Sequence, residues 1–431
     1  MRWYGFYGRN TTNGILYPVR YGMNMMHLAE FQRLIRRSMK EAFFPGAVYA
    51  VGGASPRVMM APPKYIQGAG VLDHIFHYLS LLDRQRFGIL ASSRGHRAEG
   101  GRVAESIQQS GGTSISAVFE GECSVAQVDK HSADLVDARI DCLIAVGGGK
   151  CVDAGKCIAY RVGVPVVIVP TLASNDAPCS ALSVMYSDAG VMDGAEFFPD
   201  NPVLVVVDTS VVAAASARYL VAGMGDAMAT WYEARVCAAN PHARTVLGAR
   251  PTLAAGVLGE LCADILYRHG EQARQDVSSG VVSSALDDVV EANTLLSGIG
   301  FESGGLAGAH GYAQGFTNLR QVEANFLHGE MVAMGVVAQL MMEGDDAEAR
   351  RVAAFFARVG LPVTLEQIGV ARNKDKELEV VAAGAMGFLG FENLPFPVTQ
   401  EKVTSGLLAG DALGQTVIAE LGDDAYRALQ A

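Results

Sequence analysis

The chain has 431 residues, of which half are hydrophobic and only 18% are charged, and its formal net charge is −11. This length exceeds the size at which a single hydrophobic core stops growing, so we expect two domains. The acidic balance argues against nucleic acid or an anionic membrane surface as the main partner. No apolar run approaches the roughly 18 residues that would predict a membrane span.

The first 58 residues differ from the rest of the chain. They carry a balance of +6, against −17 for the remainder, and they show no clear alternation of strand and helix patterns. Three interpretations remain open: an Arg-rich targeting segment, an added interaction arm, or upstream codons translated because the start was placed too early, since Met59 and Met60 immediately precede the first regular pattern. We expect this extension, residues 1–58, to be non-catalytic.

Residues 59–217 alternate between strand and helix patterns. We expect helices over Val71 to Leu82, 99–110, 125–138 and Lys150 to Arg161, and strands at Phe87 to Ala91, Ile115 to Phe119, Cys142 to Val146, Val164 to Val169, Ser183 to Tyr186 and Val203 to Val207. This alternation predicts a parallel sheet with helices on both faces. After Thr209 the chain becomes rich in Ala, Leu, Val and Met, so residues 218–431 are expected to form a helical domain.

A glycine turn follows the expected strand at Cys142 to Val146. Gly147, Gly148 and Gly149 lie between this strand and the next helix, where they allow an anion to approach the backbone and the helix N-terminus. No Ser or Thr follows Lys150 to hold magnesium, so this is not a Walker motif. Its place at the carboxyl end of a central strand favours a ligand site, although many such turns use glycine only for close packing.

Two histidines eighteen positions apart, His310 and His328, lie at the edges of a glycine-rich stretch with few charges. Asp226, in Gly223-Met-Gly-Asp226, has a similar apolar setting. Two neutral imidazoles and one carboxylate suit a catalytic zinc ion with a fourth position open for substrate. The alternative is three buried polar residues that only form hydrogen bonds with the backbone.

Five segments together resemble the glycerol dehydrogenases of the group III, iron-containing alcohol dehydrogenase superfamily. They are the glycine turn, Pro170 to Tyr186, Gly223 to Asp226, and the Ala309-His310 and His328-Gly329-Glu330 motifs. The resemblance implies a Rossmann-like α/β dinucleotide-binding domain followed by an all-α metal-binding domain, the dehydroquinate synthase-like architecture. It also implies an NAD(P)-dependent alcohol dehydrogenase that oxidises glycerol to dihydroxyacetone, located in the cytoplasm and assembled as a homo-oligomer. The seven scattered cysteines, none in a CxxC pair, fit a reducing compartment.

The resemblance also assigns roles to residues of this sequence. Asp226, His310 and His328 match the ligands of one zinc ion per subunit, and Asp176 and His310 match the catalytic, substrate-contacting positions. The implied cofactor is NAD, and the matching cofactor-binding positions are Ser92, Gly148, Gly149, Asp153, Thr171, Ser174, Ser180, Leu182 and Tyr186.

Three departures from the family pattern bear on function. Thr230 occupies the position of a fourth, iron-type histidine ligand, and Ala313 replaces a histidine often found three residues after the first histidine ligand. The expected strand ending at Ala91 is followed by Ser92 where NAD-preferring members usually have aspartate, and Arg94 and Arg97 come soon after. Losing a carboxylate and gaining arginines is what a 2′-phosphate would tolerate, so we expect weaker discrimination against NADP.

Three other functions are weighed against glycerol oxidation. Another polyol or diol, such as a propanediol or butanediol, would use the same chemistry. A dehydroquinate-synthase-like lyase shares the two-domain plan, but a phosphorylated substrate needs basic residues beside the metal, and only Arg320 lies between His310 and His328. A non-catalytic binding protein is disfavoured because all three ligand positions and the glycine turn are present.

Overall fold

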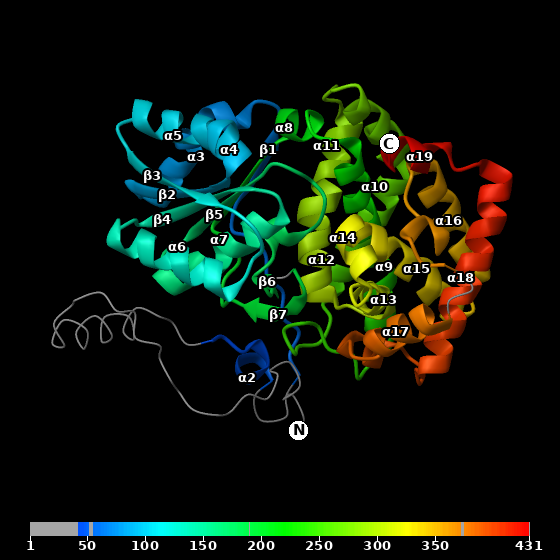
Figure 1. Cartoon of the computed structure of the whole chain (residues 1–431). Coiled ribbons are helices and arrows are strands. Elements are labelled where there is room, and N and C mark those ends of the chain that lie inside the picture. The colour runs from blue at the N-terminus through cyan, green and yellow to red at the C-terminus, as the bar shows by residue number, and fades with distance from the viewer. Residues whose placement is uncertain (1–41, 51–54, 189, 372–374, 431) are drawn as a thin grey trace.

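The computed structural model describes residues 42–50, 55–188, 190–371 and 375–430. An α/β region built on a parallel sheet lies beside a region made only of helices, and the chain passes from one to the other near residues 209–217 (Figure 1). The expected fold class is therefore confirmed. Of the N-terminal extension, residues 1–41 and 51–54 lie outside the described part of the chain.

The main sheet has six parallel strands in the order β1-β8-β5-β4-β2-β3. Its strands are β1 (Tyr65–Gly68), β2 (Arg86–Ser92), β3 (Thr113–Phe119), β4 (Cys142–Gly147), β5 (Val166–Pro170) and β8 (Leu204–Asp208). Every residue of β4 and β8 is buried. This burial explains why they read as continuous apolar runs, as is usual for strands covered on both faces.

Alternate residues of the strands face two different helical layers. Ile89, Ile144 and Val206 pack with the layer of α3 (Ile75–Leu79) and α5 (Glu99–Gln109). Leu90 and Leu143 face the layer of α6 (Val125–Asp137) and α7 (Gly149–Val162). Short helices α4 (Ser93–Arg97) and α8 (Thr209–Ala213) follow β2 and β8.

Most of the expected elements are present, and the main differences are one broken helix and two additional strands. The expected helix over residues 71–82 is helical throughout but broken into a 3-10 turn, the short helix α3 and a second 3-10 turn. Strand β1 was not expected, because its four residues are only half-buried and carry no alternating pattern. The same holds for β7 (Met192–Phe197), which forms an antiparallel hairpin with β6 (Leu182–Tyr186).

The described part of the extension lies against this hairpin. Helix α2 (Pro45–Tyr49) follows an isolated antiparallel bridge between Phe43 and Phe197 of β7, and Gly46 approaches Gly248 closely (Figure 1). Residues 42–50 are therefore part of the folded molecule.

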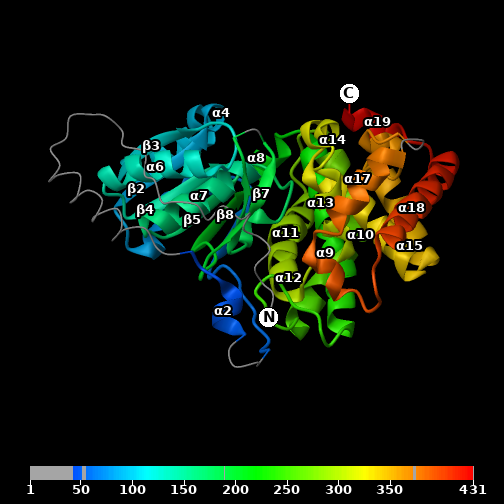
Figure 2. The same cartoon turned by 60° about the horizontal axis from the view of Figure 1, so that its bottom comes forward.

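The helical region contains α9 (Ala217–Ala239), α10 (Leu253–Ser278), α11 (Ser284–Glu291), α12 (Ser297–Gly304), α13 (Gly308–Phe316), α14 (Arg320–Asn325), α15 (His328–Glu343), α16 (Asp346–Val359), α17 (Asp375–Ala385), α18 (Gln400–Leu421) and α19 (Asp424–Gln430). Helix α9 is central, since it packs against α10, α12 and α15, and α13 packs on α15 (Figure 2). A π-helical turn, Ala292–Leu296, joins α11 to α12. Within the described residues, no helix combines the length and apolarity needed to cross a membrane.

Candidate active site

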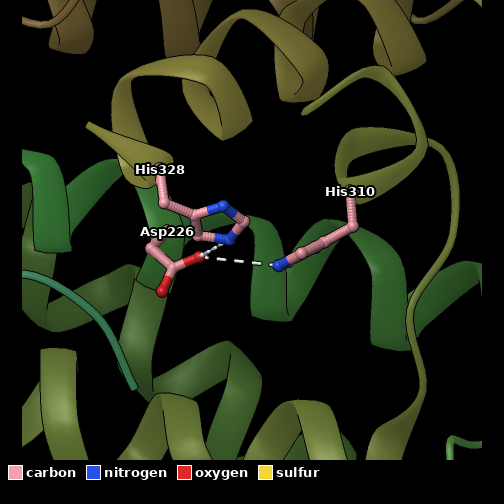
Figure 3. Close-up of side chains that lie close together, drawn as sticks. All are labelled: Asp226, His310 and His328. Carbon is pink, nitrogen blue, oxygen red and sulfur yellow. Dashed lines mark ion pairs between the residues drawn. The ribbon is translucent and has the colours of Figure 1, made fainter. Parts of the chain in front are cut away.

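The three expected metal ligands come together from three helices of the helical region. Asp226 lies in the middle of α9, His310 in the first turn of α13 and His328 at the first residue of α15 (Figure 3). Asp226 Oδ1 is 3.5 Å from His310 Nε2 and 3.4 Å from His328 Nε2. One donor atom from each residue lies within 4.8 Å of the others.

These distances fit a metal better than direct hydrogen bonds. Ligands about 2.1 Å from a tetrahedral zinc ion are about 3.4 Å apart, whereas hydrogen-bonded N and O atoms are closer, near 2.9 Å. The Asp226 side chain is only 2% exposed, yet neither of its carboxylate oxygens has a hydrogen-bond partner among the described residues. A buried carboxylate left in this state is costly unless a cation satisfies it.

The electrostatics of the cluster favour a cation. Burial alone would raise the pKa of the Asp226 carboxyl, but the contacts with His310 and His328 outweigh burial and hold it well below its usual range. Burial lowers the pKa of His310, while the charges of Glu233 and Asp226 raise it more strongly. Carboxylates therefore surround these imidazoles and stabilise positive charge at the place where a metal ion would sit.

Glu233, which contacts the His310 ring, is a further functional candidate that was not predicted from the sequence. Its side chain is completely buried, and its Oε2 lies 2.6 Å from Nδ1 of His310. Its Oε1 accepts hydrogen bonds from the backbone N–H groups of Ala307 and His310. The carboxylate thus holds Nδ1–H and leaves Nε2 free to bind a metal. Glu233 follows Asp226 by seven residues, two helical turns, so the shared helix face was the available signal.

Two glycines bring the ligand-bearing helices together. An added Cβ on Gly329 would overlap the carbonyl oxygen of Ala222, and one on Gly225 would overlap the carbonyl oxygen of Gly329. Helices α9 and α15 therefore touch backbone to backbone beside Asp226 and His328. Only glycine permits an approach this close.

Asp176 lies next to the cluster of Asp226, His310 and His328, in the loop after β5. Burial, and then the charge of Asp226, raise the pKa of its carboxyl well above its usual range. Its Oδ2 accepts a hydrogen bond of 3.0 Å from Ser297, whose hydroxyl is 2.9 Å from that of Thr230. Thr230, which occupies the position of a fourth, iron-type ligand, therefore supports the contact between Ser297 and Asp176. Ala313 is buried and lines the cavity beside His310.

A cavity of about 2380 Å³ runs from this cluster to the carboxyl ends of β2, β3 and β4. Of the expected site residues, the cavity is lined by Ser92, Gly148, Gly149, Asp153, Ser174, Asp176, Ser180, Leu182, Tyr186, His310 and His328. Thr171 is buried and does not line it; its N–H donates to the carbonyl of Gly147 and so supports the glycine turn. Residues 42–47 and Ala50 form another part of the wall.

A buried lysine holds together the part of the cavity wall that lies near the glycine turn. Lys156 forms an ion pair of 3.0 Å with Asp153 and donates hydrogen bonds to the carbonyls of Ala177 and Leu182 and to the Ser180 hydroxyl. Burial raises the pKa of the Asp153 carboxyl, whereas the charge of Lys156 lowers it. The carboxylate of Asp153 therefore pairs with the lysine that holds the segment from Ala177 to Leu182. Asp153 also lines the cavity.

Glu302 joins the two regions of the molecule. It lies on α12, is fully buried, and accepts hydrogen bonds from Ala181 N at 2.8 Å and from Asn201 Nδ2 at 2.7 Å. Burial raises the pKa of its carboxyl to about 7, although these hydrogen bonds lower it. This role could not be predicted from the sequence, because both partners are more than a hundred residues away.

Comparison with known proteins agrees with this geometry. The family model for iron-containing alcohol dehydrogenase matches residues 62–209. A glycerol dehydrogenase of Escherichia coli is 41% identical over 84% of this chain and 99% of its own length. The crystal structure of a probable glycerol dehydrogenase from Sinorhizobium meliloti has a TM-score of 0.77 at 36% identity, covering 84% of this chain and 99% of that one. The glycerol dehydrogenase structure from Schizosaccharomyces pombe has a TM-score of 0.79 at 31% identity, covering 86% and 94%.

The parallel sheet carries the glycine turn, and the neighbouring helices present one aspartate and two histidines. Together these features define an alcohol dehydrogenase built from an α/β region and a helical region. Identity of 41% across nearly the whole of a relative shows more than a shared fold. The chain belongs to the iron-containing alcohol dehydrogenase family, within which it is an enzyme of the glycerol dehydrogenase type.

Proposed function

We propose that the enzyme oxidises glycerol to dihydroxyacetone, transferring hydride to NAD, with a zinc ion held by Asp226, His310 and His328. The observation that carries this proposal is the spacing of those three donors around a buried carboxylate that has no hydrogen-bond partner among the described residues. The names of the relatives from Escherichia coli and Schizosaccharomyces pombe support the choice of glycerol.

The chain's own residues divide the work at the metal end. A zinc ion bound here supplies Lewis-acid chemistry, which lowers the pKa of a coordinated hydroxyl. Glu233 fixes the His310 ring so that Nε2 faces the donor cluster. Asp176, oriented by Ser297, accepts a hydrogen bond from a second substrate hydroxyl and so favours a polyol over a simple alcohol. Because the His328 side chain is 46% exposed, the cluster opens into the cavity from which substrate arrives.

At the other end, the turn at Gly148 and Gly149 leads into α7, whose N-terminal N–H groups and dipole suit the pyrophosphate of NAD. Lys156 holds the loop that carries Ser180 and Leu182, which line the same cavity. This arrangement supports the proposal that a dinucleotide binds along the wall between the sheet and the cluster of Asp226, His310 and His328, where the protein would supply orientation for hydride transfer.

The same geometry suits 1,2-propanediol and 2,3-butanediol, which also carry neighbouring hydroxyls. The lyase alternative loses support, because Arg320 is exposed and is not part of the cavity wall.

We also predict that the enzyme assembles into homo-oligomers. Light scattering on the purified protein tests this prediction.

One set of measurements tests the proposal. Purified enzyme is analysed for zinc and iron, and reduced nicotinamide is followed by absorbance with NAD or NADP and with glycerol, 1,2-propanediol or 2,3-butanediol. We expect about one zinc per chain and the highest kcat/KM for glycerol with NAD. A higher kcat/KM for a diol than for glycerol would contradict glycerol as the substrate. Full activity in metal-free protein would contradict the role of the metal.

A further inference from the structure

An acidic residue, Glu120, lines the proposed cofactor end of the cavity. It follows β3, the strand beside β2. Strands β2 and β3 are parallel neighbours with Ser92 opposite Phe119, so the residues that follow them, Ser93 and Glu120, lie side by side. The Ser93 hydroxyl donates to Glu120 Oε1 at 2.7 Å. Both residues line the cavity, as does Gly148 of the glycine turn.

The charges around Glu120 are unevenly compensated. The two cations that line this end of the cavity each face a carboxylate: Arg94 lies 3.5 Å from Glu99, and Lys150 pairs with Glu122. Glu120 has the neutral Ser93 hydroxyl as its hydrogen-bond partner, and it takes part in no ion pair among the described residues. This part of the wall therefore presents a negative charge at the end of β3.

Ser92 has a structural task of its own. Its hydroxyl accepts a hydrogen bond from Gly95 N at 3.2 Å and so caps the N-terminus of α4. Its side chain carries no charge that would repel a phosphate, and Arg94 is already directed to Glu99. The end of β2 thus leaves cofactor selection to its neighbour.

We propose that Glu120 determines cofactor specificity, by accepting hydrogen bonds from the hydroxyls of the adenosine ribose and repelling a 2′-phosphate. In dinucleotide-binding folds a carboxylate beyond the phosphate turn performs this task, and here β3 supplies it instead of β2. A hydrogen bond from a ribose hydroxyl to a carboxylate is charge-assisted, whereas a 2′-phosphate would bring a second anion to the same place. The enzyme therefore prefers NAD, contrary to the expectation from Ser92, Arg94 and Arg97. This inference rests on the proposed use of a nicotinamide dinucleotide.

The test compares kcat/KM for NAD and NADP in wild type, Glu120→Gln, Glu120→Ser and the double variant Glu120→Gln/Ser92→Asp. We expect the wild type to favour NAD at least about a hundredfold, and both single variants to lower that ratio by roughly tenfold or more through KM. The KM for glycerol should not change. Ser92→Asp should restore the preference, since aspartate caps a helix as well as serine does. Glu105→Gln, an exposed glutamate on α5, is the matched control.

Equilibrium binding separates this inference from the proposed reaction. Calorimetry with ADP and with 2′,5′-ADP needs no turnover, and Glu120→Gln should shift relative affinity toward 2′,5′-ADP. If the wild type fails to oxidise glycerol but shows this shift, the reaction is wrong and the role of Glu120 stands. A ratio that stays within about twofold of the wild type in both single variants, or a wild type that uses both cofactors equally, would overturn the role of Glu120.

Discussion

At the metal end of the cavity, Asp226 and Glu233 are almost completely buried and their positions follow from the packing of α9, α13 and α15. At the proposed cofactor end, the exposed side chains Arg94 and Glu120 lie beyond the ends of neighbouring strands, Arg94 in α4 after β2 and Glu120 directly after β3. Substitutions at the first end should destabilise the fold, because these charged side chains are enclosed by packed helices and Glu233 also has three hydrogen-bond partners. The second can change one side chain at a time without disturbing the core. If the two proposals hold, reaction chemistry and cofactor choice depend on different parts of the cavity, and a substitution at the second part destabilises the fold less.

The largest effect is expected from removing a ligand at the buried end. His310→Ala should abolish metal binding and lower kcat/KM for glycerol by on the order of 10³ or more, since about 4 kcal/mol of transition-state stabilisation is lost. Elemental analysis and steady-state kinetics check this. His269→Ala, which removes a partly exposed histidine on α10, is the control and should keep both metal and activity. A metal-free His310→Ala enzyme with normal turnover would refute the assignment.

A smaller loss is expected at Asp176. Asp176→Asn should lower kcat/KM for glycerol by roughly 1–3 kcal/mol, mainly through KM, because a hydrogen bond between the buried carboxyl and the substrate is lost. The KM for NAD should stay near its wild-type value. Ser297→Ala removes the group that donates to Asp176 and should give a weaker effect in the same direction. Equal changes in both KM values would instead indicate that Asp176 only supports its loop.

Glu233→Gln tests whether burial at the metal end serves orientation. An amide that replaces this carboxylate must point its NH2 either at His310 Nδ1 or at the backbone N–H groups of Ala307 and His310. In the first case the ring has to move its proton to Nε2, which then cannot bind metal. We expect zinc affinity to fall roughly 10–100-fold, measured by competition with a chromophoric chelator. Glu343→Gln, on α15, is the control; equal affinity in all three proteins would show that Glu233 has only a structural role.

The last effect concerns stability instead of catalysis, at Glu302, which joins the two regions of the molecule. With the pKa of its carboxyl raised to about 7 from an ordinary 4.5, the folded state holds this proton more tightly than the unfolded state. Its contribution to stability is therefore present below pH 4.5 and is lost as pH rises through 7, by on the order of 3 kcal/mol. Urea unfolding of wild type and Glu302→Gln across this window should show the decline only in the wild type. Parallel pH profiles would contradict it.

The sequence predicted the parts of the site that depend on local pattern. The glycine turn follows a buried strand, and the histidines and Asp226 stand out because apolar residues surround them. The sequence did not predict the roles of three buried charged residues, Glu233, Lys156 and Glu302. Their partners lie far away in the chain, and a sequence pattern does not distinguish a buried charged side chain from an exposed one. The expectation of relaxed cofactor choice rested on β2 alone, and only the pairing of β2 with β3 brings Glu120 into view.

The backbone contact between α9 and α15 has a consequence for the way mutational scans are interpreted. Gly225 and Gly329 carry no functional group, so a survey of reactive side chains would assign them no part in catalysis. Yet a single methyl group at either position would collide with a carbonyl oxygen and push the helix bearing His328 away from the helix bearing Asp226. In a library selected for growth on glycerol, alanine at these two positions should be depleted as strongly as substitutions of the ligands themselves. Abundance measured without selection should distinguish loss of folding from loss of the metal site.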